Sequence, residues 1–105
     1  MSSILEATGP VTTVVIAGAA DIGVATPGIA WRVLAADLNA AADAVPTFTS
    51  GTTPTVVYGV MQIAAKGQKV LGFNPCGWCQ SKAGEKLSIT GAVTGQVVLQ
   101  QVRSH

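Results

Sequence analysis

The sequence predicts an all-β domain, a single antiparallel β-sandwich or jelly-roll-like barrel of about seven to eight strands. Glycine (12 residues), proline and threonine interrupt the chain at short intervals, and the runs between these breaks are rich in Val, Ile, Thr and aromatic residues. No internal repeat, heptad or linker divides the 105 residues. We therefore expect one β-sandwich domain over 11–105, preceded at 1–10 by an N-terminal arm or the start of a strand.

Four runs in the first half of the chain are typical of strands. VTTVVIA, at 11–17, is almost entirely β-branched, and IAWRVLAADL, at 29–38, is a long apolar run around a tryptophan. VPTFTS, at 45–50, carries Phe48 among Val and Thr, and VVYGVMQI, at 56–63, carries Tyr58 among Val, Met and Ile. Residues 34–44 are rich in alanine but lack an amphipathic stripe, so we assign the first half to a strand and the second half to a loop.

Three further strands are predicted at 69–73, 86–90 and 96–102. The segment 86–90 alternates apolar and polar residues, as expected for a strand with one solvated face. The turn sequences between the predicted strands supply the Gly and Pro that tight connections require.

The last predicted strand, QVVLQQV, has apolar residues on both faces. Val97 and Leu99 share one face, and Val98 and Val102 lie on the other. Because neither face is purely polar, we expect the face of Val98 and Val102 to contact another layer or another subunit.

Charge is unusually scarce. Only 10% of residues are charged, the net charge is +1, and the mean hydropathy is +0.48, whereas about 25% charged residues is typical. Little repulsion would keep copies apart, so the composition suits a protein that covers surface in an assembly. The six Lys and Arg residues are scattered, so we expect no nucleic-acid partner.

Neither a membrane span nor a secretory signal is predicted. The longest apolar stretch, 14–20, is far shorter than the roughly 20 residues of a membrane helix. The N-terminal residues lack a basic region followed by an apolar one. We expect synthesis in a reducing cytoplasm.

The stretch FNPCGWCQS contains both cysteines, Cys76 and Cys79, around Trp78. A redox dithiol would need a helix after Cys79, but a strand pattern follows. Structural zinc needs four ligands, and the chain offers two Cys and one terminal His. We predict two buried, reduced thiols packed beside Trp78, while a turn at Pro75 and Gly77 leaves a local disulfide open.

Other chemistry is sparse. The chain has no nucleophile elbow, P-loop or dinucleotide-binding glycine motif. Trp31 and Tyr58 could stack on a sugar, although aromatic residues in alternating strands are more often core or interface residues. We therefore expect no enzymatic activity, no catalytic residue, no cofactor and no metal.

From about Trp31 onward the chain resembles small β-sandwich virion proteins of tailed bacteriophages, particularly capsid decoration or cement proteins. Three motifs carry the likeness, F-x-S-G-T-T at 48–53, N-P-x-G-W at 74–78 and A-G-E-x-L-x-I at 83–89. The resemblance implies that N-P-x-G-W forms a corner with its tryptophan packed on the sheet. The cysteine pair departs from the pattern.

The resemblance also implies a function and partners. Copies would form a homotrimer on the capsid exterior, bind the major capsid protein and stabilise the head. We expect contacts from Ile4 and Leu5 in an N-terminal arm, and from the face of Val98 and Val102. The alternatives are a carbohydrate- or receptor-binding β-domain of a phage fibre or tail and, third, a CxxC redox protein.

Overall fold

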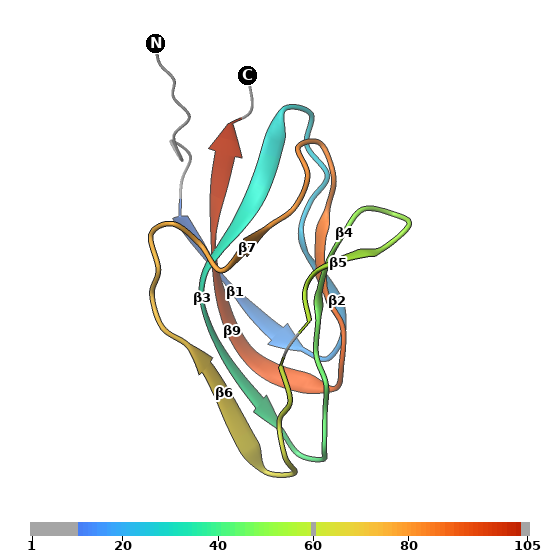
Figure 1. Cartoon of the computed structure of the whole chain (residues 1–105), viewed down its shortest axis with the longest axis vertical. Coiled ribbons are helices and arrows are strands. Elements are labelled where there is room, and N and C mark those ends of the chain that lie inside the picture. The colour runs from blue at the N-terminus through green and yellow to red at the C-terminus, as the bar shows by residue number, and fades with distance from the viewer. Residues whose placement is uncertain (1–10, 60, 104–105) are drawn as a thin grey trace.

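The computed structural model describes residues 11–59 and 61–103, and within them the chain forms nine strands and no helix (Figure 1). The all-β prediction is confirmed, with more strands than the seven to eight expected. None of the described residues belongs to a helix that could cross a membrane. The strands are β1 (Val11–Ala17), β2 (Ala20–Gly23), β3 (Ile29–Ala40), β4 (Phe48–Ser50), β5 (Thr55–Tyr58), β6 (Gly67–Leu71), β7 (Cys79–Gln80), β8 (Leu87–Ile89) and β9 (Val93–Arg103).

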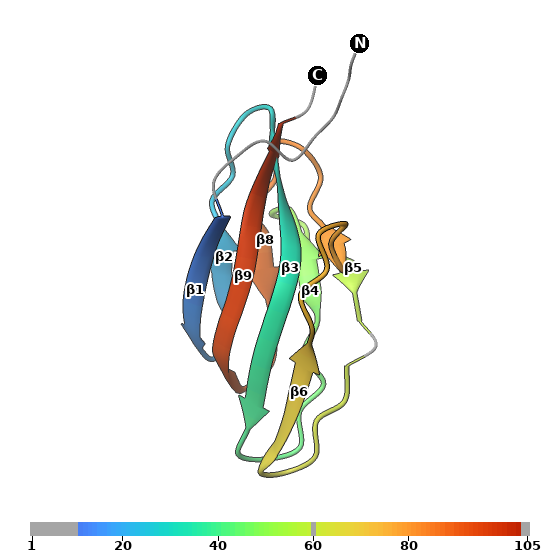
Figure 2. The ribbon, with the colours of Figure 1, turned by 90° about the vertical axis from the view of Figure 1, so that its left-hand side faces the viewer.

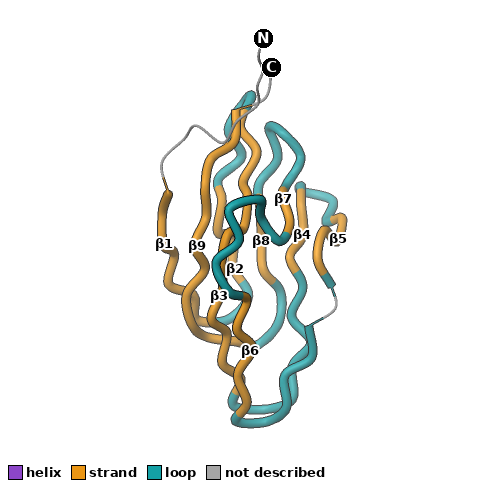
Figure 3. The backbone as a smooth tube through the Cα atoms, turned by 60° about the vertical axis from the view of Figure 1, so that its left-hand side comes forward, coloured by secondary structure: helices purple, strands orange, loops and turns teal. Residues whose placement is uncertain are grey.

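The strands form two antiparallel sheets that pack face to face (Figures 2 and 3). Sheet A has the order β1-β9-β3-β6, and the short β7 also pairs with β3. Sheet B has the order β2-β8-β4-β5. The long central pair of β3 and β9 forms most of sheet A, with eleven paired positions from Ile29↔Arg103 to Ala40↔Val93.

The pairing follows the jelly-roll pattern. β1 pairs with β9, β2 with β8, β3 with β6, and β4 with β5. The chain is thus a long hairpin ribbon of paired strands, and successive pairs along the ribbon lie alternately in sheet A and sheet B. Rolling that ribbon brings β9 beside β3 and β8 beside β4. The jelly-roll-like prediction agrees with this topology, in which β7 is an addition to eight principal strands.

The core lies between the sheets and is made of alternate residues of the long strands. Val33, Leu38, Val97 and Leu99 from sheet A are fully buried. They face Phe48 of β4 and, from β8, Leu87 and Ile89, which are also buried. The predicted alternation of 86–90 is therefore confirmed, as is the predicted shared face of Val97 and Leu99, which the structure places in the core.

The opposite side of sheet A, which we call the outer face, carries few charges. Among the described residues, Arg32 and Asp37 are the two charged ones on this face, and each is engaged by a glutamine. Arg32 Nε donates to Gln80 Oε1 at 3.1 Å, and Gln68 Nε2 donates to Asp37 Oδ1 at 2.6 Å. Among the residues that the strand register places there are Val11, Thr13, Val15, Arg32, Ala35, Asp37, Asn39, Gln68, Val70, Gln96, Val98 and Gln100.

Several predicted strand ends were wrong. The run predicted at 56–63 stops at Tyr58, before Gly59, although Ile63 still pairs with Ala44 as an isolated bridge. The run predicted at 69–73 ends at Leu71, and the strand predicted at 45–50 begins only at Phe48. β3 continues two residues beyond the predicted end, and β9 extends to 93–103. The bounds of β1 are those predicted.

Candidate functional site: an aromatic edge

Three of the five aromatic side chains, Tyr58, Phe73 and Trp78, lie where β5 meets the loop that joins β6 to β7, and we call these three residues the aromatic edge. The Tyr58 and Trp78 rings meet edge to face, with centroids 6.3 Å apart and an interplanar angle of 73°. Such a contact contributes about 0.5–1.5 kcal/mol beyond the area that it buries. It joins the two sheets, because Tyr58 belongs to sheet B and Trp78 directly precedes β7 of sheet A.

A tight turn in N-P-x-G-W fixes the loop. Gly77 N donates to Asn74 O at 2.8 Å, and Pro75 occupies the second position of the turn, where its fixed φ fits. The Asn74 side chain accepts from Cys76 N at 3.0 Å. The predicted corner at Pro75 and Gly77 is therefore present.

Backbone bonds attach this corner to the central strand of sheet A. Asn74 N donates to Leu34 O, and Trp78 N donates to Val33 O, both at 2.8 Å. Trp78 Nε1 donates to Gly72 O at 2.7 Å, which holds the indole over its own loop. The corner is consequently an ordered platform rather than a loose connection.

Gly77 is required at this corner for two reasons. Its φ is +86°, in the region that favours glycine. A Cβ at this position would also collide with Cγ of Arg32, whose stem crosses the turn. Arg32 in turn donates to Gln80, so the guanidinium lies beside the aromatic edge.

The cysteines have different environments. Both are free thiols. Cys79 is half-buried and packs against the core, as predicted, whereas Cys76 is exposed, so the prediction that it packs as a small apolar side chain was wrong. Cys76 is exposed because it occupies the third position of the turn, which points away from the sheet.

Burial raises the pKa of Cys79 to about 12, from an ordinary value of 9.0. A reactive redox thiol needs the opposite shift, which a helix N-terminus or a nearby cation provides. In the described part of the chain no helix follows Cys79, because Cys79 begins β7 and the next element is β8. This environment does not favour dithiol chemistry.

Alkylation should separate the two thiols. At pH 8, folded protein treated with iodoacetamide should gain one adduct, at Cys76, and a second only after unfolding, as measured by mass spectrometry. The reason is that Cys79 is covered and protonated. Because its pKa is raised by folding, its contribution to stability is complete below pH 9 and is lost as the pH rises towards 12. Two equally fast adducts would contradict this placement, and none without reductant would indicate a disulfide.

The other residues singled out from the sequence lie elsewhere. Trp31 is half-buried, and its ring packs directly on Gly23. Its Nε1 donates to Val24 O at 2.8 Å, so it closes one end of the sandwich. Val98 is half-buried on the outer face, and Val102 is only 7% exposed. Ile4 and Leu5 lie outside the described residues.

Phe73 was not recognised from the sequence as a site residue. It is 69% exposed, because β6 ends at Leu71 and Gly72 turns the chain out of the sheet. The sequence G-F-N-P, at 72–75, could have indicated this exposure, because Phe is its one apolar residue and stands between residues that favour turns. With Trp78, it gives this edge two accessible aromatic rings beside the amides of Asn74 and Gln80, a combination that can stack on an apolar ring face and donate hydrogen bonds.

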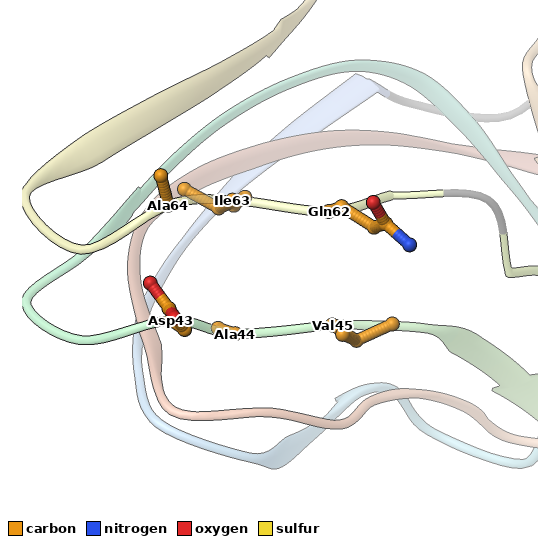
Figure 4. Close-up of a pocket in the computed structure, with 6 residues that line it drawn as sticks. All are labelled: Asp43, Ala44, Val45, Gln62, Ile63 and Ala64. Carbon is orange, nitrogen blue, oxygen red and sulfur yellow. The ribbon is translucent and has the colours of Figure 1, made fainter.

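Two hollows lie away from this edge. A groove of about 450 Å³ is lined by residues of the two bridged segments 43–45 and 62–64 (Figure 4). Its carboxylate, Asp43, already accepts from Ala65 N at 2.8 Å. A second hollow of about 320 Å³ contains Glu85, which accepts from Ser50 Oγ at 2.6 Å. In the described ranges, no three His, Cys, Asp or Glu side chains are grouped so as to hold a metal ion.

No protein-family model, curated protein or solved structure matches this chain.

Proposed function

We propose that the chain is a structural virion protein that binds the major capsid protein lattice and stabilises the head as a decoration protein. The supporting observation is the outer face of sheet A. It is broad and built from valines, hydroxyls and amides, and its two charges are both engaged by glutamines. Such a face can be covered by a protein partner with little cost for removing ions from water.

Further support comes from composition and from analogy of fold. Because only 10% of its residues are charged, copies of the chain repel one another little, and their association is favoured. Jelly rolls occur in viral capsid domains, although the same fold also serves lectins and enzymes. In this proposal copies form a homotrimer on the capsid exterior, and weak contacts repeated over the shell give strong overall attachment.

The proposal is tested by co-sedimentation with intact capsids. The wild-type protein should pellet with particles and raise their resistance to heat, and removing the protein should lower that resistance. Val70→Lys, on the outer face, should weaken pelleting at least about tenfold, which corresponds to roughly 1.4 kcal/mol. The matched control is Val24→Lys, at a valine of similar or greater exposure outside the outer face, which should pellet normally. Failure of the wild-type protein to bind any capsid offered would contradict the proposal.

A second candidate is a carbohydrate- or receptor-binding domain of a fibre or tail, and the aromatic edge favours it. Phe73 and Trp78 present accessible rings from an ordered loop, which is how aromatic residues bind sugar faces. Titration with oligosaccharides of the host surface, followed by tryptophan fluorescence, tests this function. Phe73→Ala should remove the binding and leave capsid pelleting unchanged.

A further inference from the structure

β1 is an edge strand without the features that normally prevent edge-to-edge pairing. It pairs with β9 through seven consecutive positions with no shift in register. No described residue pairs with its other edge. In an antiparallel pair, alternate residues point their N–H and C=O groups away from the partner strand, so β1 presents a row of backbone donors and acceptors that no described strand engages.

The other edges of the two sheets are protected. β2 has four residues, a register shift after Asp21, and an ion pair in which Lys86 Nζ lies 3.2 Å from Asp21 Oδ2. β5 is equally short and is preceded by Pro54, and its partner β4 is shifted at Phe48. β6 carries Lys69, and the corner loop follows it.

Within its own bounds β1 has none of these devices, although Pro10 precedes it as Pro54 precedes β5. The segment VTTVVIA contains no charge, no proline and no glycine, and six of its seven residues are β-branched. Val11 and Val15 are 55% and 73% exposed. Natural proteins avoid leaving such a segment open, because it pairs readily with another strand.

We propose that β1 is a docking strand for the β1 strand of a second copy of this chain, in antiparallel register about a twofold axis at Val14. This register places Thr13 opposite Val15, Thr12 opposite Ile16 and Val11 opposite Ala17. β-Branched residues oppose each other in nearly every pair, and no like charges meet, so the strand is complementary to itself. Pairing joins the two A sheets into one continuous sheet and merges their outer faces.

The proposal does not depend on the virion function or on a trimer. If copies make no other contact, β1 pairing gives a dimer. If copies also form trimers whose threefold axis crosses the β1 twofold axis at a right angle, it joins trimers in pairs. In both cases, blocking β1 halves the mass of the assembly. This halving distinguishes failure of the present proposal from failure of the decoration role, which capsid pelleting tests.

The test compares two double variants at the exposed positions Thr13 and Val15. Thr13→Lys with Val15→Lys places two lysine pairs face to face across the twofold axis, and light scattering should find half the wild-type mass over a range of protein concentrations. Thr13→Glu with Val15→Lys loads the same positions with charge but pairs Glu with Lys across the axis, so it should keep the wild-type mass.

Four outcomes would overturn the proposal. They are an unchanged mass in the lysine variant, loss of the assembly in both variants, a wild-type protein that is monomeric at every concentration, and an open ladder of copies. Circular dichroism first checks that the variants fold. Should the lysine variant not fold, hydrogen exchange of the wild-type protein decides: protection of the β1 amides that face away from β9, rising with concentration, supports the pairing, and rapid exchange at all concentrations overturns it.

Discussion

Replacement of Gly95 by alanine is expected to destabilise the fold by roughly 3 kcal/mol or more, since a strained backbone conformation and an overpacked contact each cost about 1–3 kcal/mol. Gly95 lies in β9 between Ile16 of β1 and Leu38 of β3. Its φ is +142°, and a Cβ there would collide with the Asp37 carbonyl oxygen and lie 2.9 Å from the Asp37 carbonyl carbon. Both atoms belong to the backbone of the central strand, so no side-chain rotation relieves the clash.

Urea unfolding followed by tryptophan fluorescence measures this effect. Gly84→Ala is the matched control, because Gly84 also has a positive φ, +83°, but a Cβ there meets nothing within 4 Å. The control should lose only about 1 kcal/mol, the cost of the backbone conformation. Equal losses in the two variants would show that the close approach of β9 to β3 is not what requires glycine at Gly95.

Replacement of Phe48 by alanine should cost about 3–5 kcal/mol, the range for deleting a fully buried aromatic ring. Phe48 is 0% exposed and lies in sheet B between Ile89 of β8 and Tyr58 of β5 in the register. Its ring belongs to the core between the two sheets, and the short strands around it can close the resulting cavity only in part.

The matched control for this second prediction is Phe73→Ala. The same atoms are removed from a side chain that is 69% exposed, so the change in the free energy of unfolding should stay within about 0.5 kcal/mol. Urea unfolding measures both variants. If Phe73→Ala were as costly as Phe48→Ala, the aromatic edge would be part of the core rather than an accessible surface.

The fold class and the longest strands could be predicted from the sequence because they are local properties. VTTVVIA forms β1 with the expected bounds, since its β-branched residues favour an extended backbone wherever they lie. The inward placement of Val97 and Leu99 likewise follows from period-two alternation.

The strands that were missed exist because of their partners. β2, with the sequence ADIG, has one large apolar residue, Ile22, and is extended because β8 pairs with it. β7 is a two-residue strand that β3 creates by pairing Val33 with Cys79. The strand order could not be predicted, because it depends on which faces meet in the core.

The candidate site was predictable in part. The corner at Pro75 and Gly77 follows from the turn chemistry of N-P-x-G, and Cys79 packs as expected. The exposure of Cys76 and Phe73 was not foreseen, because it depends on where β6 ends. The contact of Tyr58 with Trp78 joins residues of different sheets, and such a contact leaves no periodic signal.

The position of β9 has a consequence for biosynthesis. β9 occupies the interior of sheet A between β1 and β3, so the last described strand completes the sheet that the first one begins, as the pair Val11↔Gln100 illustrates. While the ribosome is still making the last strand, β1 and β3 have no common neighbour, and the apolar side chains that should meet Val97 and Leu99 stay accessible. Because contacts between distant parts of a chain form slowly, sheet A should be completed only after β9 has emerged, and chaperones can bind the open sheet until then.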